Sequence, residues 1–280
     1  MRPTRGLMYM AASALGFSAM SVLVKIASPR LPTGEIVLSR ALVTLGLSYV
    51  MVRRAGLSPW GHHKRKLVLR GVVGFGGLAG SYAALAALPL ADATTMQNTT
   101  PLLTALLAWW LLDERVGRAT ALALAFGLAG VIVIARPGGD GLDPAGVAAA
   151  LGGAACSAVA YVTVRQLSRT EHPLVIVFYF PLVAAPLAIP WAAWDFAVPR
   201  PIDWLLLVAI GVATQIGQVF LTMGLALERA GRATSVGYLQ ICFAMLWQLA
   251  VFGDVPSAAT LVGSALIVAG TLVTTADREA

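Results

Sequence analysis

The chain has 280 residues, of which 58% are hydrophobic and 12% charged, and its formal net charge is +7. Its mean hydropathy of +0.80 lies above the range of soluble domains, which excludes a soluble globular protein. Charged residues gather in short clusters, separated by segments of the roughly 20 apolar residues that a membrane-spanning helix needs. These segments lack the alternating pattern of a membrane barrel. We therefore predict an all-α membrane protein.

Ten segments fit this description. The first follows Arg2 and Arg5, and because it is long enough to span and nine more segments follow, we interpret it as a retained helix and not as a signal peptide. The predicted transmembrane helices are Gly6–Lys25, Gly34–Val52, Leu67–Leu88, Ala91–Leu112, Gly117–Ala135, Pro144–Arg165, Pro173–Trp191, Asp203–Leu227, Ala230–Phe252 and Ser257–Thr275.

The distribution of basic residues predicts the orientation. With a cytoplasmic N-terminus, fifteen of the 20 Lys and Arg residues fall at cytoplasmic ends or loops, including the run Lys64–Lys66. This excess follows the positive-inside rule and places both termini in the cytoplasm. It also accounts for the basic balance without a nucleic-acid partner. The five cations on the other side are Lys25, Arg30, Arg40, Arg136 and Arg200.

The two halves of the chain match without gaps at an offset of 140 residues, which is half of 280. We interpret residues 1–140 and 141–280 as two repeats of five helices each. Because five is odd, the second repeat enters the membrane from the opposite side. Such inverted repeats are typical of secondary transporters, whose solute site lies near the midplane where the repeats meet. Matching pairs include Gly6 with Gly146, Ala14 with Ala154, Gly71 with Gly211, Gly77 with Gly217, Thr94 with Thr234 and Gly130 with Gly270.

The unit Ala91–Ala135 resembles the repeat of the drug/metabolite transporter superfamily, EamA type. It has an Ala-Thr-Thr start, Pro101 in mid-helix, the turn Leu112–Arg115 and the glycine-bearing end Gly127–Ile134. Arg40 stands where that family commonly carries an arginine. The second half departs from the pattern at Ile241 and Phe252–Asp254. The resemblance implies ten helices and export of metabolites, amino acids or drugs without an ATP site. By overall likeness the chain is most similar to bacterial aromatic amino acid exporters.

Several kinds of chemistry are disfavoured by the sequence. It contains no phosphate-binding glycine loop with Lys-Ser/Thr, no Ser/His/Asp set and no paired intramembrane carboxylates. Cys156 and Cys242 lie in apolar segments without metal-ligand spacing. We expect no cofactor, no metal and no enzymatic activity. Proton coupling would have to use Glu35, Asp92 or another group near the rim, because the first helix holds no acid.

Polar and aromatic residues inside the helices indicate a candidate binding site, since such groups are unfavourable in hydrocarbon unless they face protein or water. We predict that the first, third, fourth, sixth, eighth and ninth helices line a central cavity and that the other four form an outer wall. The alternative is that the amides only hydrogen-bond between helices. The predicted lining residues are Phe17, Ser21, Tyr82, Gln97, Asn98, Tyr161, Gln215, Gln218, Tyr238 and Gln240.

Two further residues have specific expectations. Pro101 removes a backbone hydrogen bond and is predicted to be a hinge of the fourth helix. Arg40 has three interpretations: it reaches the membrane surface, it pairs with Glu35, or it binds a substrate carboxylate. We favour a structural role for it.

The leading interpretation is a secondary transporter that exports small metabolites by alternating access. An aromatic and amide lining suits aromatic or other neutral amphipathic amino acids. A multidrug exporter is the alternative, and a channel or membrane enzyme is a third reading without support in the sequence. We expect a monomer in a bacterial inner membrane, with a small-molecule substrate, the lipid bilayer and no nucleic acid as its partners.

Overall fold

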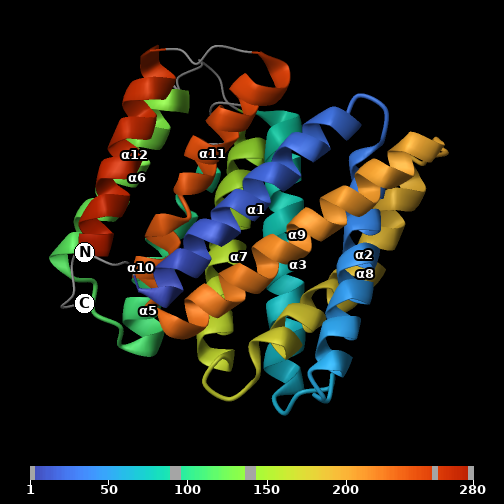
Figure 1. The fold of residues 1–280 in the computed structure, drawn as a ribbon, viewed down its shortest axis with the longest axis horizontal. Coiled ribbons are helices and arrows are strands. Elements are labelled where there is room, and N and C mark those ends of the chain that lie inside the picture. The colour runs from blue at the N-terminus through green and yellow to red at the C-terminus, as the bar shows by residue number, and fades with distance from the viewer. Residues whose placement is uncertain (1–3, 89–95, 136–142, 254–257, 277–280) are drawn as a thin grey trace.

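The computed structural model describes residues 4–88, 96–135, 143–253 and 258–276, and every regular element among these residues is a helix (Figure 1). The start of the predicted helix Ala91–Leu112, with Asp92, lies outside the described residues, and so does Ser257. The helices are α1 (Arg5–Ala27), α2 (Thr33–Arg54), α3 (Lys64–Ala87), α5 (Thr100–Leu112), α6 (Arg118–Ala135), α7 (Pro144–Leu167), α8 (Pro173–Trp194), α9 (Pro201–Leu227), α10 (Ala230–Val236), α11 (Leu239–Trp247), the π-helical turn η1 (Gln248–Phe252) and α12 (Ala258–Ala276).

Among the described residues, seven helical segments are long and apolar enough to cross a membrane. Six of them are α1, α2, α3, α7, α8 and α9, and the seventh is the run Ala230–Val251 that contains α10 and α11. The apolar helices α5, α6 and α12 are shorter. The prediction of a multi-helix membrane protein is therefore confirmed, and the count of ten crossings stays a prediction.

Local sequence explains where several helices begin. α7, α8 and α9 each have a proline in the first turn, where a missing N–H removes no helical hydrogen bond. At α7 the Asp143 side chain also accepts the backbone N–H of Gly146 at 3.0 Å. The predicted starts at Pro144 and Pro173 agree with the observed ones.

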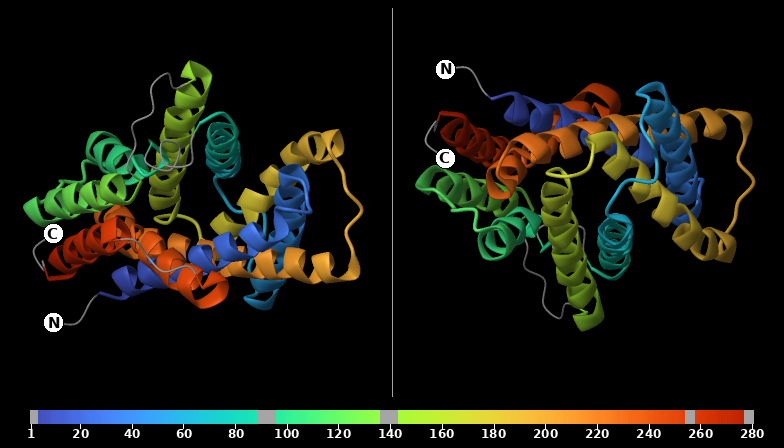
Figure 2. Two further views of the ribbon diagram at one scale, coloured as in Figure 1. Left: turned by 90° about the horizontal axis from the view of Figure 1, so that it is seen from above. Right: turned by 90° about the horizontal axis from the view of Figure 1, so that it is seen from below.

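The helices pack in pairs that follow the repeat. α1 packs along α9, and α3 packs along α7; an offset of 140 residues converts one pair into the other. α2 with α8 and α6 with α12 are pairs that the same offset maps onto themselves. Figures 1 and 2 show α6 and α12 on one side of the bundle and α2 and α8 on the other, with the remaining helices between them. The helix contacts thus have an approximate two-fold relation.

Small residues allow the closest of these contacts. A Cβ atom on Gly80 of α3 would lie 2.7 Å from the Cα atom of Gly153 of α7, so the two backbones touch there. In the related pair, a Cβ on Gly217 of α9 would lie 2.9 Å from the ring of Phe17 of α1. The glycine-rich face of α3 therefore serves packing within the chain, as small residues do between membrane helices.

One end of the bundle is basic and well packed. We call the end where α1 and α3 begin and α2 ends the basic end, because it carries Arg5, Arg53, Arg54 and Lys64–Lys66. The largest apolar cluster joins α1, α2, α3, α5, α7, α8, α9 and α10 there, through side chains such as Leu7, Leu67, Leu167, Ile176 and Leu225. At the opposite end the described residues form two separate smaller clusters, one of α1, α2 and α9 and one of α3 and α7.

Many large apolar side chains lie on the outer surface of the bundle. Trp110 is 72% exposed, and Leu261 and Leu272 are exposed by more than half. Apolar surface spread over so many helices would cause aggregation in water but is compatible with a hydrocarbon environment. This surface agrees with a protein embedded in a membrane.

Candidate functional site

Two helices are interrupted at corresponding places in the two repeats. The chain makes a short helical turn at Met96 and Gln97, turns at Asn98 and Thr99, and then begins α5 at Thr100. In the second half α10 ends at Val236, the chain turns at Gly237 and Tyr238, and α11 begins at Leu239. Asn98 and Tyr238 are 140 residues apart, so the two breaks occupy equivalent positions of the repeat.

The position of Pro101 corrects one expectation. The residue stands in the first turn of α5 and not in mid-helix, so its missing N–H removes no hydrogen bond from that helix. The interruption lies just before it, at Asn98 and Thr99. The mid-helix position was therefore wrong, and the hinge role of Pro101 stays a prediction.

Tyr238 connects the two breaks directly. Its side chain is 2% exposed, and its hydroxyl donates a 3.0 Å hydrogen bond to the backbone carbonyl of Asn98. The Tyr238 ring packs against Gly127 of α6, where no Cβ atom would fit. A carbonyl released by one broken helix thus receives its hydrogen bond from the break of the other.

The other predicted residues of the first break make contacts with α3. The Gln97 side-chain amide donates to the carbonyl of Ser81 at 2.9 Å, and the Thr100 hydroxyl donates to the carbonyl of Gln97 at 2.8 Å. Gln240, the second residue of α11, is half-buried, and its backbone N–H donates to the carbonyl of Gly237 at 3.0 Å. The breaks are therefore held by polar contacts on both sides.

Gln218 and Tyr161 lie beside a residue that the sequence analysis had assigned only to topology. Arg70, in the second turn of α3, is 2% exposed and donates from Nη2 to the Gln218 side-chain oxygen at 3.2 Å. Its guanidinium lies 4.4 Å from the centre of the Phe180 ring of α8, and Tyr161 of α7 lies within reach of its charge. Three apolar residues separate Arg70 from the exposed run Lys64–Lys66, and this spacing is the sequence signal that sets Arg70 apart from that run.

Gln215 is placed differently from its neighbour Gln218. It accepts a 3.1 Å hydrogen bond from the Ser48 hydroxyl, and its amide nitrogen lies 3.4 Å from the sulfur of Met51. Both partners are on α2, and Gln215 is 5% exposed. Its contacts therefore fit the alternative of a hydrogen bond between helices.

The remaining predicted residues lie along α1 and in the far half of α3. The Phe17 ring covers Gly217 of α9, while the Ser21 hydroxyl donates to the Phe17 carbonyl at 2.9 Å within α1. Tyr82 packs edge-on against Trp191 of α8, with ring centres 5.6 Å apart. The two described pockets, of about 560 Å³ and 360 Å³, lie at the basic end and contain none of the predicted residues. The central cavity stays a prediction.

Arg40 does not pair with Glu35 in the described structure. Its Nη1 atom lies 3.6 Å from the sulfur of Met20, whereas Glu35 accepts the backbone N–H of Ala197 at 3.3 Å. Arg40 is 8% exposed, and Tyr82 lies within reach of its charge.

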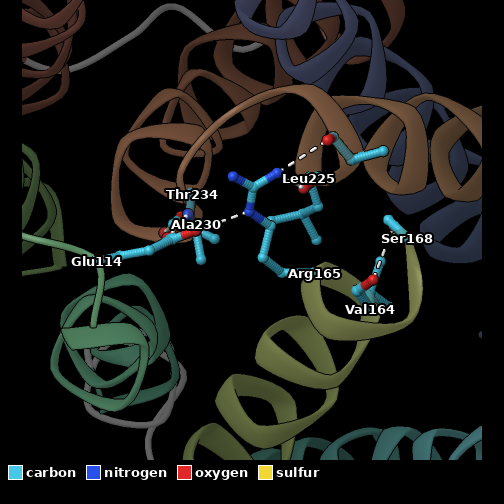
Figure 3. Close-up of polar contacts among 8 residues, drawn as sticks. Glu114, Val164, Arg165, Ser168, Leu225, Ala230 and Thr234 are labelled. Carbon is cyan, nitrogen blue, oxygen red and sulfur yellow. Dashed lines mark hydrogen bonds and ion pairs between the residues drawn. The ribbon is translucent and has the colours of Figure 1, made fainter. Parts of the chain in front are cut away.

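A polar network closes the basic end between the two repeats (Figure 3). The Nε atom of Arg165, near the end of α7, donates to Glu114 at 2.8 Å, and Nη1 donates to the carbonyls of Leu225 at 3.3 Å and Ala226 at 2.8 Å. Glu114 also accepts the backbone N–H of Ala230 at 2.7 Å. Arg165 thus binds the carbonyl end of α9, and Glu114 binds the first N–H of α10. Both contacts are favoured by the helix dipoles, which are negative at the carbonyl end and positive at the N–H end.

A second contact at this end joins two loops. Glu171 accepts the backbone N–H groups of His62 at 2.6 Å and His63 at 2.5 Å, and lies 3.4 Å from the His62 side chain. Burial raises the pKa of the Glu171 carboxyl, but the hydrogen bonds and the His62 side chain outweigh it, so its pKa lies below the ordinary value of 4.5. The ionised carboxylate therefore stabilises the loop contact. Among the described residues no group of His, Cys, Asp and Glu is arranged to hold a metal ion.

Comparisons with known proteins agree with this architecture. The model of the EamA-like transporter family matches residues 4–136 and 144–276, one match in each half of the chain. A solved crystal structure superposes with a TM-score of 0.86 over 98% of both chains, and at 23% sequence identity this likeness concerns the fold alone.

Three similar proteins have names of transporters or solute carriers. The pseudopaline exporter of Pseudomonas aeruginosa is 37% identical over 253 residues, which cover 90% of this chain and 89% of the exporter. The mouse solute carrier family 35 member G1 is 30% identical over 99% of this chain and 79% of its own length. The riboflavin transporter of Rhizobium johnstonii is 27% identical over 97% of this chain and 91% of its own length.

Proposed function

Since the chain belongs to the EamA-like transporter family, we propose that it is a secondary transporter that exports small organic solutes by alternating access, without ATP. The observation that carries this proposal is the pair of helix breaks at Asn98 and Tyr238, joined by a hydrogen bond between equivalent positions of the two repeats. Interrupted helices at matching positions are typical of the solute sites of secondary transporters. The family and the similar exporter are transporters, and this favours a transporter over an enzyme.

We propose ten crossings arranged as two inverted five-helix repeats, residues 1–140 and 141–280. The three shorter helices α5, α6 and α12 supply the crossings that length alone does not establish. The basic end faces the cytoplasm by the positive-inside rule, and both termini lie on that side. A bacterial inner membrane is the location suggested by the exporter from Pseudomonas aeruginosa. The unit that transports is a monomer.

The site centres on the two breaks and on the neighbouring aromatic and amide side chains. Phe17, Tyr82 and Tyr161 offer ring surface, and Gln97 and Gln218 offer amides. Such a combination suits aromatic or other neutral amphipathic amino acids. The named relatives handle pseudopaline and riboflavin, so the family transports more than one kind of solute.

The structure supports a state that is closed toward the cytoplasm. The largest apolar cluster and the Arg165 network both lie at the basic end, whereas the described clusters at the opposite end are separate. In export, solute release then occurs on the opposite side, and reloading requires the basic-end contacts to break.

Counterflow into proteoliposomes tests this function. Vesicles that contain the purified protein are preloaded with unlabelled phenylalanine and diluted into a trace of labelled phenylalanine. We expect a transient accumulation of label above equilibrium, and its loss in Gln218→Ala, whereas Tyr49→Phe at an exposed position serves as the control. Equilibration without an overshoot would indicate a channel. No exchange of any amino acid by folded protein would refute the amino acid substrate, and a further trial with riboflavin would test the wider proposal.

A further inference from the structure

Two arginines lie inside the helix bundle without a carboxylate partner. Arg40 is 8% exposed and Arg70 is 2% exposed. None of the ion pairs formed among the described residues includes either of them. A buried cation that no anion compensates is strongly unfavourable, and inside membrane proteins such groups mark solute or ion pathways. Arg40 and Arg70 are two such cations.

Arg70 has free donors that are held in a fixed direction. Its Nη2 atom donates to Gln218 at 3.2 Å, but Nε and Nη1 are buried without a hydrogen-bond partner in the described part of the chain. The guanidinium lies 4.4 Å from the centre of the Phe180 ring, and Tyr161 lies within reach of its charge. The ring and the amide fix the plane of the guanidinium, while two of its nitrogens still need an acceptor.

Arg40 lies in a chemically similar set on the other side of the membrane. Among the described residues, the hydrogen bond of its guanidinium goes from Nη1 to the sulfur of Met20 at 3.6 Å, which is a weak acceptor. The charge of Arg40 also reaches Tyr82, whose ring packs edge-on against Trp191. Each half of the membrane therefore contains an arginine, a tyrosine and another aromatic ring. Two helices that we expected to form the outer wall, α2 and α8, contribute Arg40 and Phe180.

The repeat relates the two sets to each other. Adding 140 to 40 gives Phe180, and adding 140 to 70 gives Ile210. The residue equivalent to Arg40 in the second repeat is thus Phe180, whose ring lies against the guanidinium of Arg70. Arg70 stands six residues after the start of α3, roughly 9 Å from the basic end, and Arg40 stands seven residues after the start of α2, roughly 10 Å from the opposite end. The chain has one arginine at comparable depth in each half.

We infer that Arg70 and Arg40 are two carboxylate-binding residues, one in each half of the membrane, and that the transported solute is an organic carboxylate with an aromatic or apolar body. This inference rests on the proposed function, because it assumes that the solute passes between the repeats. A guanidinium binds a carboxylate through two parallel N–H···O bonds, and the neighbouring rings bind the apolar body. As the site changes from access on one side of the membrane to access on the other, the solute carboxylate compensates the charge of Arg70 and then that of Arg40.

Binding of matched probes tests the inference. Purified full-length protein is titrated with phenylalanine and 3-phenylpropionate, which carry a carboxylate, and with phenylalaninamide and 2-phenylethylamine, which do not. We expect the wild type to bind the first two and not the others. Arg70→Gln and Arg40→Gln should each weaken carboxylate binding by about tenfold to a hundredfold, because a charged hydrogen bond is lost. Arg65→Gln, at an exposed position of the same helix, should bind as the wild type does.

Arg70→Met separates a binding role from a folding role. It keeps an unbranched side chain against Phe180 and removes the uncompensated cation, so we expect thermal stability equal to or above that of the wild type, with carboxylate binding lost. Lower stability of Arg70→Met together with unchanged carboxylate binding by Arg70→Gln would show a structural arginine and overturn the inference. Equal binding of carboxylates and amides by the wild type, or no binding of any carboxylate probe, would overturn it as well.

The same experiments distinguish this inference from the proposed function. Carboxylate binding that depends on Arg70, in protein that shows no counterflow, would refute export and leave the binding residues in place. Counterflow that continues with phenylalaninamide as efficiently as with phenylalanine would establish the carrier and refute the role of the arginines.

Discussion

Gln215 and Gln218 stand three residues apart on α9 and make unlike contacts. Gln215 bonds to Ser48 of α2, whereas Gln218 accepts a hydrogen bond from Arg70 of α3. Spacing along one helix shows that two side chains share a face, but the neighbouring helix decides whether a polar group serves packing or the solute. The contacts assign Gln215 to packing and leave Gln218 in the proposed site.

Leucine substitutions of these two residues should therefore have opposite effects. Gln215→Leu should lower the free energy of unfolding by about 0.6 kcal/mol, the average for hydrogen bonds between membrane helices, and keep counterflow. Gln218→Leu should abolish counterflow while the protein stays folded, because it removes the acceptor that orients Arg70. Thermal unfolding and counterflow of both variants measure the difference. Loss of transport in Gln215→Leu alone would contradict the assignment.

The carboxyl of Glu171 predicts a pH dependence of stability. Because its pKa in the folded protein lies below the ordinary 4.5, its contribution is complete above the unfolded pKa and is lost as pH falls through the folded pKa. We expect Glu171→Gln to lower the unfolding free energy by about 1 to 2 kcal/mol at pH 7 and to reduce the loss of stability on acidification below about pH 4.5. Unfolding curves at several pH values measure this, with exposed Asp195→Asn as the control. Parallel pH profiles for Glu171→Gln and wild type would contradict it.

At the scale of the helix, the two breaks support each other. Interrupting a helix within a membrane leaves carbonyl and N–H groups that water does not reach, so each must find a partner in the protein. The Asn98 carbonyl finds the hydroxyl of Tyr238, and the Gln97 carbonyl finds the hydroxyl of Thr100. Asn98 and Tyr238 are equivalent residues of the two repeats, so a contact between them lies close to the approximate two-fold axis that relates the repeats.

Removal of the Tyr238 hydroxyl should affect both stability and transport. In Tyr238→Phe the carbonyl of Asn98 loses this hydrogen bond at a part-buried position, and we expect a loss of about 1 to 3 kcal/mol in unfolding free energy and slower counterflow. Tyr49→Phe, 48% exposed on α2, is the matched control and should change neither. Wild-type stability and rate in Tyr238→Phe would show that the two breaks are not coupled through this bond.

The sequence predicted the elements better than the site. Hydropathy and charge clusters place helix ends within a few residues, because the thickness of the bilayer fixes the length of each spanning helix. The helices of soluble proteins have no such fixed length. The expected mid-helix position of Pro101 was wrong, because a proline in a long apolar run indicates a kink but does not show which residue turns. Arg70 was missed because its neighbours in sequence are exposed cations, while its burial depends on Phe180 and Gln218, more than 100 residues away.

At the scale of the whole molecule, closure of the basic end depends on few polar contacts. Arg165 joins α7 to the end of α9 and, through Glu114, to the start of α10. The two alternating conformations of a transporter must differ little in free energy. Contacts that form in only one of them can therefore shift the equilibrium between the two. We propose that Arg165 makes contacts of this kind.

Arg165→Gln should favour opening of the basic end. A cysteine introduced as Ala108→Cys, at a position 1% exposed on α5, should react with a maleimide about tenfold to a hundredfold faster when Arg165 is replaced, because charged hydrogen bonds are lost. The background lacks Cys156 and Cys242, and exposed Arg169→Gln is the control. An unchanged labelling rate in Arg165→Gln would show that the network is not a gate.

Alternating access itself requires the two ends to move in opposite senses. Pulsed electron paramagnetic resonance measures this with spin labels on the exposed residues Leu111 and Leu227 at the basic end, and on Ser28 and Ala87 at the opposite end. In lipid nanodiscs with phenylalanine added, we predict that longer distances at the basic end appear together with shorter distances at the opposite end. Both distances lengthening together, or one end moving while the other stays fixed, would contradict transport by exchange of the two repeats.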